Sequence, residues 1–455
     1  MSTTTTDPSP PSEQNVPRPA PTTRVALRLL ARRVHFLAGV AIAPFLAVLC
    51  LTGFAYAFTP QLTNALHHHE LFVDSASGSR QPVATQIEVA LRANPAAELK
   101  AVIPPVDVDR TTQVVLSMSE SAGHAGHSTV TRTVYVDPYT NRINGTLATV
   151  SNRPPVQTWL REFHGNLHLG EVGRLYSEFV ASWLPIVVVG GLVLWLGQRR
   201  RKRELLVPKL RGTTGRPRLR GLHGALGLWL AAGLLAVSVT GLTWSNYAGA
   251  RFDQAIDALD GRSPSLTAPA VAVPVEGLPI TVDRALEAAA SAGLTGELTV
   301  TPPAAADRPF KIAETSQGWP IQKDSVAVDP YLGTVTGRVN WDDYPLTAKL
   351  TTIGIQAHSG TLLGPANQIA MALLAIGTLV LLAVGYRMWW QRRPAGRTRA
   401  PVWRQLPKPA LIAVVVGTVA LGWVLPVLGV SLAVFLVFDA VNTRVFDAVN
   451  TRVRT

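Results

Sequence analysis

Four long apolar runs are arranged as two pairs in this chain, and their repetition constrains the fold more than any other feature. The run led by His164 returns 194 positions later, without a gap, behind His358. The run led by His35 returns 188 positions later behind His223. The same two shifts align Gly170 with Gly364, Gly191 with Gly385, Trp195 with Trp389, Gly39 with Gly227, and Thr52-Gly53 with Thr240-Gly241. Because about 20 apolar residues cross a bilayer as one helix, the chain is predicted to be an internally duplicated, membrane-spanning helical protein.

The predicted fold class is a membrane α bundle of two plus two spans and a fifth, carrying two small extracytoplasmic α+β modules. The fifth apolar run has no counterpart in the repeat, and the tail after it contains the octapeptide VFDAVNTR twice. The expected boundaries are a disordered cytoplasmic tail (1–23), span 1 (24–58), outer module 1 (59–163), span 2 (164–198), a basic cytoplasmic loop (199–220), span 3 (221–245), outer module 2 (246–357), span 4 (358–393), a second cytoplasmic loop (394–408), span 5 (409–438) and the repeated tail (439–455).

The charge distribution predicts the topology. The formal net charge is +13, yet charged residues are only 16% of the chain and its mean hydropathy is +0.21. Ten Lys or Arg residues lie between Arg199 and Arg220, and seven lie between Arg387 and Lys408. Such clusters beside apolar runs are typical of cytoplasmic loops and argue against nucleic acid as a partner. We therefore expect a multi-pass protein of the cytoplasmic (inner) membrane with a cytoplasmic N-terminus; the side of the C-terminus stays open.

A cleaved signal is an alternative interpretation of the first run, since Ala55-Tyr56-Ala57 resembles a cleavage site. The mid-chain copy of this run disfavours it, because that copy cannot be a signal.

The outer segments repeat as well. Residues 133–147 and 325–339 both contain alternating apolar residues up to a Val-Asp-Pro-Tyr turn, followed by a second short run. This pattern predicts a β-hairpin in each segment. An Ala-rich helical stretch precedes each hairpin, at Thr85–Asn94 and at Thr281–Ala292. Each outer segment is therefore expected to be a small module of one helix and antiparallel strands.

Four histidines at the ends of the predicted spans are the strongest functional candidates: His35, His223, His164 and His358. An ionisable group at the membrane is costly and suggests a function. The repeat relates His35 to His223 near the cytoplasmic face and His164 to His358 near the outer face. Two neutral imidazoles facing each other are what a bis-histidine haem requires, and glycines at fixed offsets would admit a flat macrocycle. Two non-covalent haems, proton relay and a structural contact are the alternatives that remain.

Other residues have less regular patterns. His168 follows His164 by one helical turn and has no repeat partner, so it is an alternative haem ligand or a polar contact. The cluster His67-His68-His69-Glu70 predicts at most weak metal binding, and the pair His124 and His127 lies in a Gly/Ser-containing loop. The single cysteine, Cys50, excludes an internal disulfide and cysteine-ligated zinc or iron–sulfur clusters. No C-x-x-C-H, nucleotide-binding glycine motif or P-loop is present.

These features together resemble the PepSY-associated transmembrane family of iron-regulated membrane proteins. The motifs that carry the resemblance are Arg-x-x-His-x3-Gly at 32–39, Thr-Gly at 52–53, Val-Asp-Pro-Tyr at 136–139 and 328–331, His-x5-Gly at 164–170 and 358–364, and the closing Trp389-Trp390-Gln391-Arg392-Arg393. The resemblance implies PepSY-like outer modules, a role in iron uptake, and for some members a di-haem ferric-siderophore reductase. By position, it assigns haem b ligation to His35, His164, His223 and His358.

The resemblance predicts a membrane oxidoreductase that transfers electrons outward to a ferric siderophore or another iron chelate. The electron donor would be quinol or a reductase partner, and the lipid bilayer is the surrounding partner. An alternative is a non-enzymatic PepSY-domain protein that binds or regulates an outer peptide, peptidase or uptake partner. A transporter of metal or chelate is disfavoured by the expectation that spans 1 to 4 contain no acidic residue.

Overall fold

The computed structural model describes residues 22–117, 130–197, 206–207, 214–391 and 406–437. Its helices are α1 (Thr23–Ala57), α2 (Thr59–Leu66), α3 (His68–Leu71), α4 (Val83–Ala93), α5 (Pro155–Asn166), α6 (Gly170–Leu196), α8 (Gly215–Leu242), α9 (Tyr247–Ala258), α10 (Val282–Ser291), the 3-10 helix η1 (Trp341–Asp343), α11 (Leu346–Ser359), α12 (Pro365–Trp390) and α13 (Lys408–Val424). Its strands are β1 (Leu99–Ile103), β2 (Thr112–Leu116), β3 (Val130–Val136), β4 (Ile143–Val150), β5 (Leu298–Thr301), β6 (Phe310–Glu314), β7 (Ser325–Val328) and β8 (Val335–Val339). His124 and His127 lie outside the described residues.

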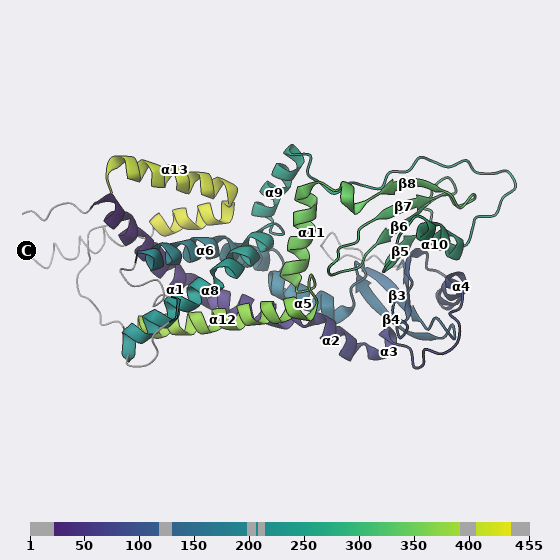
Figure 1. Ribbon diagram of the computed structural model, residues 1–455, viewed down its shortest axis with the longest axis horizontal. Coiled ribbons are helices and arrows are strands. Elements are labelled where there is room, and N and C mark those ends of the chain that lie inside the picture. Colours follow the sequence, from purple (N-terminus) through teal and green to yellow (C-terminus); the bar gives the residue numbers. More distant parts are fainter. Residues whose placement is uncertain (1–21, 118–129, 198–205, 208–213, 392–405, 438–455) are drawn as a thin grey trace, which may run out of the picture.

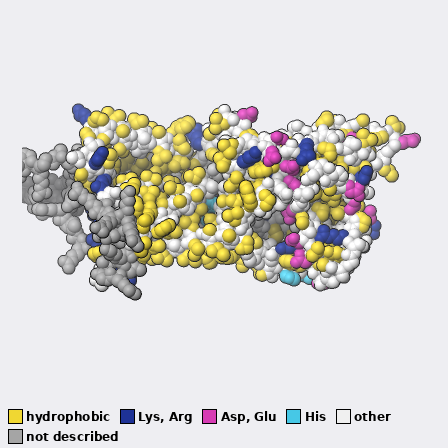
Figure 2. Space-filling view, viewed as in Figure 1, with side chains coloured by type: hydrophobic (Ala, Val, Ile, Leu, Met, Phe, Trp, Pro, Cys, Tyr) yellow, Lys and Arg dark blue, Asp and Glu magenta, His cyan; other side chains and the backbone are white. Residues whose placement is uncertain are grey.

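Helices α1, α6, α8 and α12 form an elongated bundle, and each is long and apolar enough to cross a membrane. Neighbouring helices contact in the order α1, α6, α8, α12 and back to α1, so that α1 and α8 stand at opposite corners. Figure 2 shows hydrophobic side chains covering the bundle, whereas most of the acidic side chains in this view lie toward the sheet. An apolar outer surface on helices of this length is what lipid requires. The chain is therefore a multi-pass membrane protein, as predicted.

Two of the predicted spans are shorter than expected, because the segment carrying each outer histidine is a separate helix. His164 belongs to α5, which ends where Leu167 and His168 adopt positive φ values of 53° and 56°. His358 belongs to α11, which ends at Gly360 with φ 81°. The left-handed conformation breaks a helix. Spans 2 and 4 therefore begin at α6 and α12 instead of at residues 164 and 358 (Figure 1).

The expected fifth span at 409–438 does not form one continuous helix. The run forms two short apolar helices, α13 and a second helix at Pro426–Val437, which fold back on each other (Figure 1). The break lies at Leu425, directly before a proline. Proline lacks an N–H group and disfavours the α conformation in the residue before it, so a continuous helix stops there. The second helix packs on the bundle, where Ser431 Oγ accepts a hydrogen bond from Trp183 Nε1 at 2.9 Å.

The two outer segments join in one eight-stranded antiparallel sheet, in the order β4-β3-β2-β1-β5-β6-β7-β8. The expectation of two separate modules missed the central β1–β5 pairing, where Val102 lies opposite Val300. Helices α4 and α10 confirm the predicted helical stretches, and both pack on buried valines of the sheet, including Val102, Val114, Val300 and Val326. A strand at the edge of a small sheet exposes unpaired backbone groups, so pairing the two edges stabilises both halves.

The two predicted hairpins are confirmed as β3–β4 and β7–β8. The aspartate of each Asp-Pro-Tyr turn is buried, and its carboxylate accepts backbone N–H groups from within the turn. Asp137 accepts from Tyr139 at 2.8 Å, and Asp329 accepts from Tyr331 at 2.7 Å. This Asx-type bonding explains why both turns need the same residue.

Glu178 contradicts the expectation that the spans contain no acidic residue. It lies within α6, is only 2% exposed, and accepts backbone hydrogen bonds from Tyr247 at 3.0 Å and Ala248 at 2.8 Å. These N–H groups belong to the first turn of α9, where the helix dipole favours a negative charge. Glu178 is therefore a structural cap that ties α9 to the bundle.

Removing this cap should destabilise the protein. Glu178→Ala leaves the buried N–H group of Ala248 and the partly buried N–H group of Tyr247 without their acceptor, so it should lower the free energy of unfolding by about 1–3 kcal/mol. Glu178→Gln keeps one acceptor oxygen and should cost less. Thermal unfolding in detergent measures both variants, and equal stability of Glu178→Ala and wild type would contradict this role.

Candidate functional site

The outer histidines lie side by side, as the repeat predicts. The ring centroids of His164 and His358 are 6.3 Å apart, with 54° between the ring planes. His164 comes from α5 and His358 from α11, so neither belongs to a spanning helix. Tyr56 stacks on His164, and Trp244 contacts His358 edge-on at 5.3 Å. The pair is thus held in an aromatic setting at the junction of the bundle and the sheet domain.

A threonine of a spanning helix orients each outer ring. Thr52 Oγ1 lies 2.9 Å from Nδ1 of His164, and Thr240 Oγ1 lies 2.8 Å from Nδ1 of His358. Each hydroxyl donates its proton to a carbonyl one turn earlier, Thr52 to Val48 at 3.0 Å. Its lone pair then accepts the Nδ1–H of the imidazole. This arrangement leaves the Nε2 lone pair of both rings available to a metal.

Both outer histidines are neutral near pH 7. Desolvation, followed by the neighbouring His358, lowers the pKa of His164 to about 4. Desolvation likewise lowers the pKa of His358 to about 4. Only a neutral imidazole can donate its lone pair to a metal, so burial keeps the pair in the form that binds.

The inner histidines form a second pair across the bundle. His35 of α1 and His223 of α8 have ring centroids 6.1 Å apart and 76° between their planes. Nδ1 of His35 donates to the carbonyl of Val187 at 2.8 Å, and Nδ1 of His223 donates to that of Leu381 at 3.2 Å. A carbonyl only accepts hydrogen bonds, so both Nδ1 atoms carry the proton. Among the described residues, the lone pair of each Nε2 is then available to a metal.

A glycine abuts each of the four rings. A methyl group added at Gly53 would lie 3.0 Å from Cε1 of His164, and one at Gly191 would lie 3.1 Å from Cε1 of His35. Gly241 and Gly385 stand in the same relation to His358 and His223, at 3.5 Å and 3.4 Å. At Gly53 and Gly191 an added methyl group would press on the ring, whereas at Gly241 and Gly385 it would be in ordinary contact.

The two pairs lie at different depths. Helix α1 carries His35 of the inner pair, and its Thr52 contacts His164 of the outer pair. The helix rises by about 25 Å between these two positions, at 1.5 Å per residue. Leu46, Val180, Leu184 and Leu234 form a buried apolar cluster on the bundle helices in the region between them. Both sites therefore occupy one bundle, one toward each end.

The ring-centroid spacing of both pairs is compatible with two imidazoles that bind one metal. A metal–imidazole bond is about 2 Å and a ring nitrogen lies about 1 Å from its ring centre, so two imidazoles on opposite faces of one metal have centroids about 6 Å apart. The separations of 6.1 Å and 6.3 Å match this value. The described residues contain no cluster of three or more His, Cys, Asp or Glu that could hold a metal ion. A macrocycle would supply the remaining ligands that the protein pairs lack.

His168 does not join the outer pair. It follows the end of α5 in a left-handed conformation and packs against Trp159 at 5.0 Å and Phe163 at 6.0 Å. Its Nδ1 lies 3.4 Å from a carboxylate oxygen of Glu162. Because α5 ends before residue 168, His168 does not follow His164 on one helical face, and its contact with Glu162 corresponds to the polar contact that was one of the two alternatives.

The predicted metal cluster His67-His68-His69-Glu70 is not assembled as a site. Three of its residues lie in the short helix α3, where successive side chains point about 100° apart. His68 stacks on Phe72, and the Glu70 side chain packs against Gly145. Consecutive helical residues diverge, so they cannot converge on one ion.

The sequence patterns did not identify the residues that orient the histidines. The repeat marks Thr52 and Thr240 as equivalent positions, since each precedes a glycine, but the sequence does not identify the hydrogen-bond partner of their hydroxyls. Val187 and Leu381 act through backbone carbonyls, which no side-chain pattern reveals. A methyl group added at Gly39 would lie 4.0 Å from the Val187 side chain, and one at Gly227 would lie 3.8 Å from the Leu381 side chain.

Comparison with known proteins agrees with these features. No curated protein matches the chain. A family model described as the PepSY-associated TM region matches residues 32–392, a stretch that begins just before His35 and includes both histidine pairs and the whole sheet domain. Since this stretch is well over half of the chain, the protein belongs to the PepSY-associated TM family.

Proposed function

We propose that this chain is an integral membrane haem b protein of iron uptake, which transfers electrons across the inner membrane to reduce a ferric siderophore or similar chelate outside. The observation that carries the proposal is the presence of two histidine pairs at haem spacing, one toward each end of the same bundle. Bound haem supplies one-electron chemistry at each pair. A ferric chelate would accept the electron beside the outer pair, and ferrous iron would leave its ligand more readily.

The protein residues have distinct tasks in this proposal. The four Nε2 atoms would hold the iron of bound haem, while Thr52, Thr240 and the carbonyls of Val187 and Leu381 fix the tautomer and the ring direction. The leucine and valine cluster in the bundle excludes water from the region between the sites. The apolar surroundings would limit the access of water to a bound cofactor and so influence its redox potential.

The finer topology is part of the same proposal. We infer a cytoplasmic N-terminus and an outer sheet domain, because the basic residues cluster at 199–220 and 387–408. We also infer that two PepSY-like modules arose by internal duplication. The matching Asp-Pro-Tyr turns, the mirrored strand order and the paired Thr–His contacts support that inference. The donor would be quinol or a reductase at the inner pair.

An absorption spectrum of the purified full chain tests the proposal. Two haems per chain with bis-histidine spectra are expected, together with oxidation of the reduced protein by a ferric siderophore. A haem-free protein that was purified from haem-replete cells with all four histidines intact would contradict the mechanism.

The orienting threonines give a more specific prediction. Thr52→Val keeps the side-chain shape but removes the acceptor for His164, so haem affinity at the outer site should fall by about 10–100-fold. Thr52→Ser keeps the hydroxyl and should retain most of that affinity. Titration of the apoprotein with haem measures the change, and equal affinity in Thr52→Val and wild type would show that the hydroxyl has no such role.

A further inference from the structure

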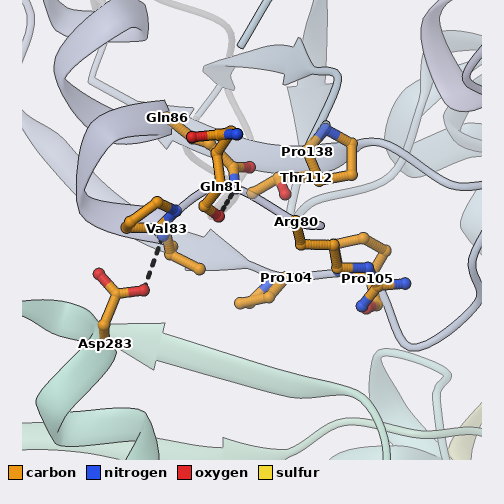
Figure 3. A pocket seen from close by; sticks show the side chains of 10 residues that line it. Arg80, Gln81, Val83, Gln86, Pro104, Pro105, Thr112, Pro138 and Asp283 are labelled. Carbon is orange, nitrogen blue, oxygen red and sulfur yellow. Dashed lines mark hydrogen bonds between the residues drawn. The ribbon is translucent and has the colours of Figure 1, made fainter. Parts of the chain in front are cut away.

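The sheet domain has a cavity that shares no residue with the histidine sites. Its volume is about 360 Å³, and its lining includes Arg80, Gln86, Pro104, Thr112, Pro138 and Asp283. Figure 3 shows Asp283 approaching from the second half of the sheet domain, while the other residues belong to the first half. The cavity therefore lies at the seam between the two halves.

Two polar atoms of this lining are buried without a protein partner. Gln86 is 1% exposed and Thr112 is 0% exposed. The amide nitrogen of Gln86 donates to the carbonyl of Gln81 at 2.9 Å, but Gln86 Oε1 and Thr112 Oγ1 have no hydrogen bond to any described residue. A buried polar atom left in this state costs free energy that a complementary ligand would recover.

The fold does not require these polar residues. Each half has the same backbone hydrogen bond before its helix: the N–H of Gln81 donates to the carbonyl of Pro138 at 2.7 Å, and the N–H of Ile280 donates to the carbonyl of Pro330 at 2.7 Å. Gln81 and Ile280 are therefore equivalent positions. Gln86 follows Gln81 by the same number of residues as Ala285 follows Ile280, so Gln86 corresponds to Ala285. Thr112 pairs with Val136 as Phe310 pairs with Val328, so Thr112 corresponds to Phe310. In the second half the same positions are apolar and buried.

The free polar groups of the cavity lining favour a ligand that donates hydrogen bonds. Four lining residues are prolines, which have no N–H group: Pro82, Pro104, Pro105 and Pro138. The guanidinium of Arg80 already donates hydrogen bonds to the carbonyls of Pro105, Val106 and Asp107. The Asp283 carboxylate accepts from Val83 at 2.7 Å and Ala84 at 2.9 Å, and its oxygens retain lone pairs. The free groups are thus mainly acceptors, with a carboxylate among them.

We propose that this cavity binds an aliphatic primary ammonium group, such as the amine end of a small molecule or peptide. The N–H donors of such a cation are complementary to the acceptors of the lining, which include Gln86 Oε1, Thr112 Oγ1 and the Asp283 carboxylate. The prolines contact the aliphatic chain. Binding would bridge the two halves of the sheet domain, because Asp283 comes from the opposite half. This site is independent of haem.

Ligand-detected NMR on the full chain in detergent tests the site with n-butylammonium. The matched probe n-butyltrimethylammonium has the same charge but no N–H donor. We expect saturable binding of the primary ammonium and binding of the quaternary ion that is weaker by about tenfold or more. Equal binding of the two cations, or no saturable binding of n-butylammonium, would overturn the proposal.

A variant locates the binding. Thr112→Val replaces the unpartnered hydroxyl by a methyl group, so it should weaken n-butylammonium binding by about tenfold and raise the unfolding temperature of the ligand-free protein. Thr299→Val, on β5 and outside the cavity lining, is the control and should leave binding unchanged. Wild-type affinity in Thr112→Val would place the ligand elsewhere and refute this site.

Discussion

His164→Ala should lose the outer haem and retain the inner one, which would halve the haem content per chain. His164 provides one of only two protein ligands that the described residues offer at the outer pair, and alanine has no group to replace its Nε2. If the outer site delivers the electron, the rate of ferric-siderophore reduction should fall by about 100-fold or more, because a residue that binds iron directly matters more than the 10–100-fold typical of an orienting partner. Haem content by absorbance and single-turnover reoxidation by the chelate measure both effects.

His168→Ala is the matched control for this variant. The two histidines lie four positions apart, but His168 packs on Trp159 and Phe163 instead of facing His358. Its replacement should leave two haems and near-normal reduction. Loss of one haem in His168→Ala, with full content in His164→Ala, would exchange the roles of the two residues and contradict the outer pair.

His223→Ala should break the route from donor to chelate without emptying the outer site. The inner pair loses one ligand, so its haem should be lost, while the outer pair is untouched about 25 Å away. Reduction by a quinol or reductase should then stop, whereas dithionite should still reduce the remaining haem. The comparison of the two reductants in one preparation separates loss of transfer from loss of folding.

The same variant distinguishes the enzymatic proposal from a purely regulatory membrane protein. A protein that only binds or regulates an outer partner should function normally in His223→Ala. His67→Ala is a suitable control, because this residue lies in the cluster that does not form a site. Iron-dependent growth supported by His223→Ala at the wild-type level would favour the regulatory role.

Most of the architecture followed from local patterns. Apolar runs of 20 or more residues predicted the four spans, since only helices of that length satisfy the backbone in lipid. Alternation up to each Asp-Pro-Tyr turn predicted the hairpins, because the aspartate closes the turn with its own neighbours. The division of the expected fifth span into two helices shows the limit of hydropathy, which counts apolar residues but does not register a helix break at Leu425.

By itself, the sequence determined which residues are equivalent, since the two repeat shifts pair His35 with His223 and His164 with His358. Only the tertiary structure decided how these residues meet. The outer histidines lie on separate helices, Thr52 and Thr240 orient them, and the β1–β5 pairing unites the two halves. The reason is physical: periodicity and turn chemistry act within a few residues, whereas a contact between α1 and α5 depends on the packing of the whole bundle.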